Sequence, residues 1–309
     1  YNQNLGDLRI RKTNLNNAWS TGNPLNTARQ GVGQAGTQTA ALAFGGYDGT
    51  AVTAVTEQYN GTNWTEVADL NTARDSSAGF GATNAAAIYA GGSGTPDGAI
   101  TESWNGTSWT EVGNLNTARN TLAGNGTSTS GLVYGGYITT NQTLTESWNG
   151  SAWTEVADLN TAIRQNAGSG ADNTSALNFG GGPPATAATE LWNGTSWFTV
   201  NSLNTARNGL GGTGIATATL AFGGAQNPPT LTAVTESWNG SIWTETSDLN
   251  LARRSIKGAG TTTTALAFGG NPITGATEEW NANSAQGVWV TGGSLNTART
   301  HIRGAGVST

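Results

Sequence analysis

A sequence repeat of about 45 residues runs along the chain and limits the folds that the chain can adopt. Its most regular part is Leu-Asn, usually followed by Thr-Ala-Arg and preceded by a segment with Asn-Gly and tryptophan. The Leu-Asn step occurs at Leu25, Leu70, Leu115, Leu159, Leu203, Leu249 and Leu295. A regular period of this length is typical of chains that repeat one supersecondary unit, so we expect a single repeat domain over residues 1–309.

Each unit carries signals for four short antiparallel strands. A glycine-rich segment follows the arginine, as in 74–81, and an apolar run that ends in Gly-Gly comes next, as in 87–92. Glycine within a strand indicates close approach of backbones, as where strands converge on an axis. A short apolar run bounded by turn residues indicates a strand buried on both faces. The stretch 101–104 is then turned back by Asn-Gly at 105–106, a strong hairpin signal, into a fourth strand at 109–112.

Four strands at this period predict an all-β fold, a β-propeller of four-stranded antiparallel blades, in preference to a solenoid with its shorter coils. Helices are not expected, because Gly and Thr interrupt every window. Our main expectation is seven blades. Residues 25–295 hold six complete repeats, 1–24 supply N-terminal closing strands, and 296–309 supply the innermost strand of a composite seventh blade that hides the sheet edges. The alternative is six blades with terminal tails.

The composition excludes several classes of function. The chain has 13 Lys plus Arg against 19 Asp plus Glu, so it lacks a cationic surface for nucleic acid. It has no Cys and one histidine, His301, which excludes disulfides and multi-histidine or thiolate metal sites. No apolar run of about 20 residues occurs, so we expect no membrane insertion. We expect no metal or other cofactor. The first residue is Tyr1 rather than Met, so we expect a processed chain or a piece of a longer one.

The order of features in each unit resembles the kelch repeat over nearly the whole chain. These features are an arginine, a glycine-rich strand, an apolar strand ending in Gly-Gly, an aromatic residue in the third strand and a tryptophan opening the fourth. The wording of 104–109 and 115–119 also resembles tandem kelch-like proteins of marine bacteriophages and their bacterial neighbours. The resemblance implies a kelch propeller, a fold used for scaffolding, for protein or glycan binding and occasionally for catalysis.

Residues that recur in every unit are interpreted as architectural, because a catalytic site needs one constellation rather than six. We expect the arginines and glutamates to join strands or neighbouring blades by charge-assisted hydrogen bonds, and the tryptophans to pack between blades. Alternatives are an arginine ring that binds an anion and tryptophans exposed as sugar platforms. In one unit an inserted Ile163 shifts Arg164, which can still reach the same place. The structural candidates are Arg29, Arg74, Arg119, Arg207, Arg253, Glu57, Glu102, Glu146, Glu190, Glu236, Glu278, Trp64, Trp109, Trp153, Trp197, Trp243 and Trp289.

The loops between second and third strands differ from unit to unit. In an up-and-down blade they share one face with the Leu-Asn connections, and unequal loops on a constant scaffold are how repeat proteins present a binding surface. Drift in unconstrained loops is the alternative interpretation. The candidate ligand-binding residues are Tyr47, Asp48, Asp97, Tyr137, Asn141, Gln142, Asn227 and Asn271.

The expected function is a non-catalytic structural and interaction module. We expect it on a virion, in a phage tail, fibre or capsid-associated position, or on another extracellular surface, where it binds a protein partner, a surface glycan or both. No catalytic residue is assigned. The alternative is a carbohydrate-active enzyme that uses a pair of carboxylates. The acidic residues outside the repeat phase are Asp48, Asp97, Asp172 and Glu279.

Overall fold

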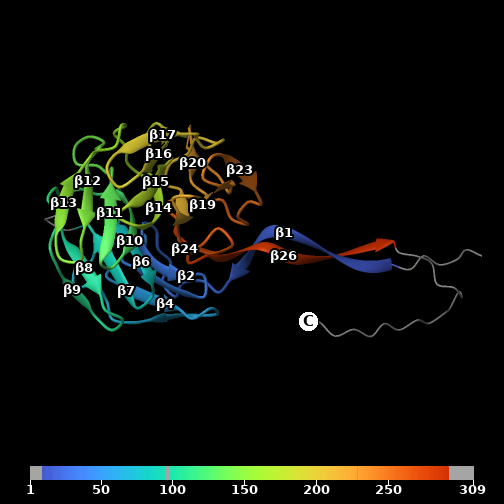
Figure 1. Cartoon of the computed structure of the whole chain (residues 1–309). Coiled ribbons are helices and arrows are strands. Elements are labelled where there is room, and N and C mark those ends of the chain that lie inside the picture. Colours follow the sequence, from blue (N-terminus) through green and yellow to red (C-terminus); the bar gives the residue numbers. More distant parts are fainter. Residues whose placement is uncertain (1–8, 95–97, 228, 292–309) are drawn as a thin grey trace, which may run out of the picture. The chain divides into compact units, whose positions relative to one another are not determined.

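A computed structural model describes residues 9–94, 98–227 and 229–291, and every regular element in these ranges is a strand. The chain forms two units, residues 17–282 and, separately, residues 1–16 with 283–309. The first unit is a β-propeller of six four-stranded antiparallel sheets (Figure 1). In the second unit, 9–16 and 283–291 are strand residues.

Blades 1 to 3 are built from consecutive strands. Blade 1 has β2 (Gly33–Thr37), β3 (Ala40–Phe44), β4 (Thr56–Tyr59) and β5 (Trp64–Glu66). Blade 2 has β6 (Ala78–Thr83), β7 (Ala86–Ala90), β8 (Thr101–Trp104) and β9 (Trp109–Glu111). Blade 3 has β10 (Ala123–Thr127), β11 (Ser130–Tyr134), β12 (Thr145–Trp148) and β13 (Trp153–Val156).

Blades 4 and 5 follow the same order, and blade 6 is made from both ends of the unit. Blade 4 has β14 (Ala167–Asp172), β15 (Ser175–Phe179), β16 (Thr189–Trp192) and β17 (Trp197–Val200). Blade 5 has β18 (Gly211–Ile215), β19 (Ala218–Phe222), β22 (Thr235–Trp238) and β23 (Trp243–Thr246), with β20 (Ala225–Gln226) and β21 (Thr230–Leu231) as a hairpin in its second loop. Blade 6 has β24 (Lys257–Gly260), β25 (Thr264–Phe268), β26 (Thr277–Thr291) and β1 (Arg9–Gly22).

The Asn-Gly turn fixes the register of the outer hairpin in each regular blade. In blade 2, Trp104 lies opposite Trp109 across the turn. The side-chain oxygen of Asn105 accepts the backbone N–H groups of Thr107 and Ser108 at 3.0 and 2.9 Å. Gly106 has φ of +95°, which a residue with a Cβ adopts only with strain. The two tryptophan rings, 5.4 Å apart between centroids, therefore pack on one side of the hairpin.

Glycine in the innermost strands allows the blades to approach one another at the axis. A Cβ added to Gly79 of blade 2 would lie 2.6 Å from the backbone nitrogen of Gln34 in blade 1. Further from the axis, six hydrophobic clusters fill the spaces between neighbouring blades. The core of the unit is therefore a ring of interfaces between blades rather than one central mass.

The N-terminal strand completes blade 6, so the expectation of seven blades is wrong and the number in the alternative, six, is right. β1 pairs with β26 as the outermost strand, and residues around Trp19 take the place that fourth strands occupy elsewhere. The physical reason lies in the last repeat. It lacks Asn-Gly after Trp280, so β26 runs on to Thr291 without a hairpin and leaves the outer position to β1. Residues 296–309, expected to form a seventh innermost strand, lie outside the described residues.

Candidate binding face and central channel

The repeated glutamate of each blade accepts hydrogen bonds from the Leu-Asn motif that precedes the blade. In blade 2, one oxygen of Glu102 accepts the backbone and side-chain N–H groups of Asn71 at 2.7 and 2.8 Å, and the other pairs with Arg74. Asn71 also donates to the carbonyl of Trp109 at 3.0 Å, which ties the motif to the fourth strand. The Arg74 and Glu102 side chains are 0% exposed, which leaves no surface for an external anion. Equivalent buried ion pairs are Arg29–Glu57 (2.9 Å), Arg119–Glu146, Arg207–Glu236 (3.2 Å) and Arg253–Glu278.

The tryptophan of each fourth strand reaches the preceding blade and closes the ring. In blade 2 the Nε1 of Trp109 donates to the hydroxyl of Thr56 in blade 1 at 3.0 Å. The Nε1 of Trp19 in blade 6 donates to the hydroxyl of Thr235 in blade 5 at 3.1 Å, so Trp19 is the sixth tryptophan of this set. The members are 4–7% exposed, so their faces are not available at the surface as sugar platforms. The side chain of Trp289 is outside the described part. The other four bonds are Trp64–Thr277, Trp153–Thr101, Trp197–Thr145 and Trp243–Thr189.

Blade 4 departs from the pattern at the arginine. The expectation that Ile163 is inserted is wrong, because the spacing from Leu159 to Gln165 equals that in the other units and Ile163 replaces the arginine. Ile163 is buried, and its carbonyl accepts the same backbone bond that the arginine carbonyls accept elsewhere. Arg164 does not take the ion-pair position; its guanidinium lies 4.1 Å from the ring centroid of Tyr137. Glu190 is left with N–H donors from Asn160 and Thr161.

The loops between second and third strands lie on one face, which we call the loop face. Short bridges connect five of these loops to the start of an innermost strand, as between Gln30 and Tyr47 or between Asn120 and Tyr137. Asp48 folds its own loop by accepting the N–H groups of Ala51 and Thr50, and these hydrogen bonds lower its pKa. The described candidates on this face are partly or fully exposed: Tyr47, Asp48, Tyr137, Asn141, Gln142, Asn227 and Asn271.

The acidic residues outside the repeat phase are spread over different places. Asp48 belongs to the loop face of blade 1, whereas Asp172 caps the turn at the opposite end of blade 4 by accepting from Thr174. Glu279 accepts the hydroxyl of Tyr59 at 2.7 Å within the interface of blades 6 and 1. Asp97, a candidate for both the binding face and the carboxylate pair, lies outside the described residues.

Six backbone hydrogen bonds form a closed circle at the loop-face end of the channel, which we call the amide ring. Each member donates its N–H to the carbonyl of the member in the preceding blade at 2.6–3.2 Å. Each has φ between +52° and +61°, so its amide turns toward the neighbouring blade. The members are Gly31, Ser76, Thr121, Gln165, Gly209 and Ser255. Sequence periodicity did not reveal this ring, because only Gly31 and Gly209 carry the usual signal for positive φ.

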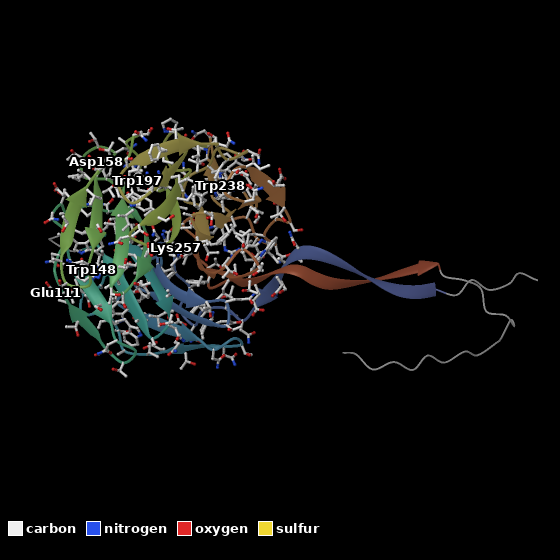
Figure 2. All side chains as sticks on the ribbon, viewed as in Figure 1. Glu111, Trp148, Asp158, Trp197, Trp238 and Lys257 are labelled. Atoms are coloured by element: carbon white, nitrogen blue, oxygen red, sulfur yellow. The ribbon has the colours of Figure 1, made fainter. Side chains whose placement is uncertain are left out.

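The channel along the propeller axis holds two distinct spaces. Below the amide ring is a cavity of about 70 Å³ lined by Leu122, Asn166 and Lys257, among others. Beyond Gln34 the channel widens to a cavity of about 310 Å³ at the opposite face, next to Phe80 and other residues of the innermost strands. Figure 2 shows Lys257 in the middle of the ring of blades and Glu111 at its outer edge. The repeat pattern gives Lys257 no role, and its one signal in the sequence is a charge within a glycine-rich strand.

The fold and the channel define the class of protein by geometry: a six-bladed β-propeller with one loop-bearing face. No protein-family model matches the chain, and no curated protein matches it in sequence. Over the described ranges, no helix is long and apolar enough to cross a bilayer. Nor does this part of the chain gather three or more His, Cys, Asp or Glu residues as a metal site would.

Proposed function

We propose that this propeller is a non-catalytic interaction module of the kelch type, which binds a protein or a glycan through its loop face. The observation that carries the proposal is that repeated residues and variable residues lie in different places. Repeated Arg, Glu and Trp side chains form buried bonds between strands and blades, whereas the loops of the loop face differ from blade to blade and remain exposed. A constant scaffold with one variable, accessible face is suited to recognition.

The chemistry of the loop face favours a polar, uncharged ligand. Tyr47 and Tyr137 offer flat rings with hydroxyl groups, and Asn141 and Gln142 offer amides that both donate and accept. Tyr137 is held by the guanidinium of Arg164, so its ring is oriented in advance. Aromatic rings with adaptable amides are common in binding loops, because they give contact area and hydrogen bonds at low entropic cost.

The proposed location is a virion or another extracellular surface. Its support is the resemblance of the Leu-Asn-Thr-Ala-Arg and Trp-Asn-Gly-Thr-Ser-Trp wording to tandem kelch-like phage proteins. A surface rich in Thr, Asn and Ser with few charges fits a module that contacts carbohydrate or the polar surface of a protein.

A pair of matched substitutions tests the binding face. Ile138 is 43% exposed on a loop of the loop face, and Ile242 is 51% exposed at an Asn-Gly turn of the opposite face. We expect Ile138→Ser combined with Asn141→Ala to reduce binding to a glycan array or to host surface proteins at least tenfold. Ile242→Ser should leave binding unchanged. Equal binding by all variants, or loss only with Ile242→Ser, would reject this face.

A further inference from the structure

Lys257 breaks the sixfold pattern at the axis of the propeller. The equivalent position of the innermost strand is glycine or alanine in the five other blades: Gly33, Ala78, Ala123, Ala167 and Gly211. Small residues are expected there because the strands converge. A long cationic side chain in one blade alone is therefore not required by the architecture.

The ammonium of Lys257 has no counter-charge in its surroundings. Among the described residues, the five ion pairs are all between Arg and Glu, and the Lys257 ammonium makes no hydrogen bond. The strands packed against β24, which are β2, β18 and β25, carry no titratable side chain. Lys257 keeps part of its surface accessible, and desolvation in this apolar and amide-lined space lowers its pKa to about 8. An unpaired cation in such a place is costly unless a ligand or water compensates it.

Asn166 of blade 4 is not a second partner for a ligand, although it belongs to the residues around the cavity of about 70 Å³. Its Nδ2 donates to Asn178 at 2.7 Å, and its Oδ1 accepts no hydrogen bond from the described residues and has almost no accessible surface. The cavity therefore presents one charged donor, the ammonium of Lys257.

We propose that this cavity binds one small oxyanion, with phosphate as the model ligand. The charged oxygens contact the Lys257 ammonium. The amide ring lies on one side of the ligand and Gln34, held by the N–H of Gly258 at 2.6 Å, lies on the other. A volume of about 70 Å³ admits one small ion and excludes a sugar or a nucleotide.

The rim of the channel is compatible with anion entry. Arg164 and Arg254 directly precede the amide-ring residues Gln165 and Ser255, and Asp75 precedes Ser76. Two cationic side chains and one anionic side chain therefore flank the mouth on the loop face. The same oxygen chemistry is found on free phosphate and on carboxylates, so the experiment has to separate these sources.

Calorimetric titration at pH 7 with phosphate, sulfate and acetate tests the site. The full chain should bind phosphate saturably at one site, should bind sulfate with similar affinity, and should bind acetate at least fivefold more weakly, because the attraction to one ammonium grows with the charge of the anion. Lys257→Met should weaken phosphate binding more than tenfold. Arg164→Gln removes one positive charge from the rim without touching the cavity and should change affinity less than twofold.

A second variant is needed in case Lys257→Met does not fold. Lys257→Ala should also abolish phosphate binding. Lys257→Ala reproduces the residue of blades 2 to 4, so its melting temperature reports whether the ring is intact. The proposal is overturned if wild type shows no saturable phosphate binding, or if Lys257→Met and Arg164→Gln lower affinity equally. Binding at the loop face is measured separately and does not depend on this outcome.

Discussion

At the scale of single residues, burial separates the roles of charged groups that look alike in the sequence. Glu146 and Glu190 occupy the same position in blades 3 and 4, are 1% and 2% exposed, and accept the same backbone and side-chain N–H groups of an asparagine. Only Glu146 has a guanidinium partner, Arg119. The two carboxylates form a natural comparison for the contribution of a buried ion pair.

We expect Glu146→Gln to destabilise the protein by about 3–5 kcal/mol, because it leaves the buried Arg119 without its counter-charge. Glu190→Gln should cost clearly less, because no arginine loses its partner. Urea denaturation of both variants measures the difference. Equal losses would show that the ion pair contributes little beyond the hydrogen bonds to asparagine.

At the scale of elements, the Gly-Gly step at the end of each second strand sets how closely neighbouring blades approach. A Cβ on Gly91 would lie 2.7 Å from the carbonyl oxygen of Arg119, whereas a Cβ on Gly106 in the Asn-Gly turn would lie 3.3 Å from the nearest atom. Both glycines have positive φ, +73° and +95°. They differ mainly in the space around them.

We expect Gly106→Ala to cost about 1–2 kcal/mol, the penalty of a side chain in the left-handed region. Gly91→Ala should cost more, because the backbone of the next blade must also shift. Comparing their denaturation midpoints isolates the close approach between blades. A smaller loss for Gly91→Ala than for Gly106→Ala would contradict the packing described here.

The N-terminal strand β1, which carries Trp19, also stabilises the ring of blades. The indole ring of Trp19 packs against Phe222 and Trp280, with centroids 5.2 and 5.4 Å away, and the residue is 7% exposed. We expect Trp19→Ala to cost about 3–5 kcal/mol, as for a large aromatic removed from a core. Phe198→Ala, at a ring that is 49% exposed on an outer strand, should cost under about 0.5 kcal/mol. If Trp19→Ala leaves the unfolding free energy unchanged, this strand does not stabilise the ring of blades.

The four-stranded blade was predictable because each strand has its own local signal, such as the apolar run of 87–92 or the turn at Asn105. The way in which the ring of blades closes was not predictable. Trp19 and Trp289 stand at the same phase of the repeat, and periodicity alone does not say which of them fills the outer place of the last blade. That choice depends on pairing between chain segments more than 200 residues apart, as between Trp19 and Thr235.

At the scale of the whole molecule, the ring brings together residues that no local pattern relates. The loop-face candidates could be grouped in advance because loops at one end of a blade share a face. The channel cavity could not, since its lining comes from all six blades, for example from Leu122 of blade 3 and Lys257 of blade 6.

The lysine on the axis makes stability depend on pH. Its pKa is about 8 in the folded protein against 10.5 when unperturbed, so the unfolded chain binds more protons between these values. The destabilising effect of the buried charge is full below pH 8 and is relieved as the pH rises toward 10.5.

In a buffer free of small oxyanions, Lys257→Ala should therefore be more stable than wild type at pH 7, with a gap that closes by pH 10.5. Tyr89, whose pKa burial raises to about 12, is common to both proteins and cancels in the difference. Urea denaturation across this range measures the gap, and a gap independent of pH would assign it to packing instead of charge.

The central feature of the fold is a ring of six blades in which the N-terminal strand is the outer strand of the sixth. An experimental density map of the full chain tests this most directly. We expect six blades, with the indole nitrogen of Trp19 within hydrogen-bonding distance of the Thr235 hydroxyl, 3.1 Å in the present structure. A seventh blade, or the indole of Trp289 in that position, would contradict it.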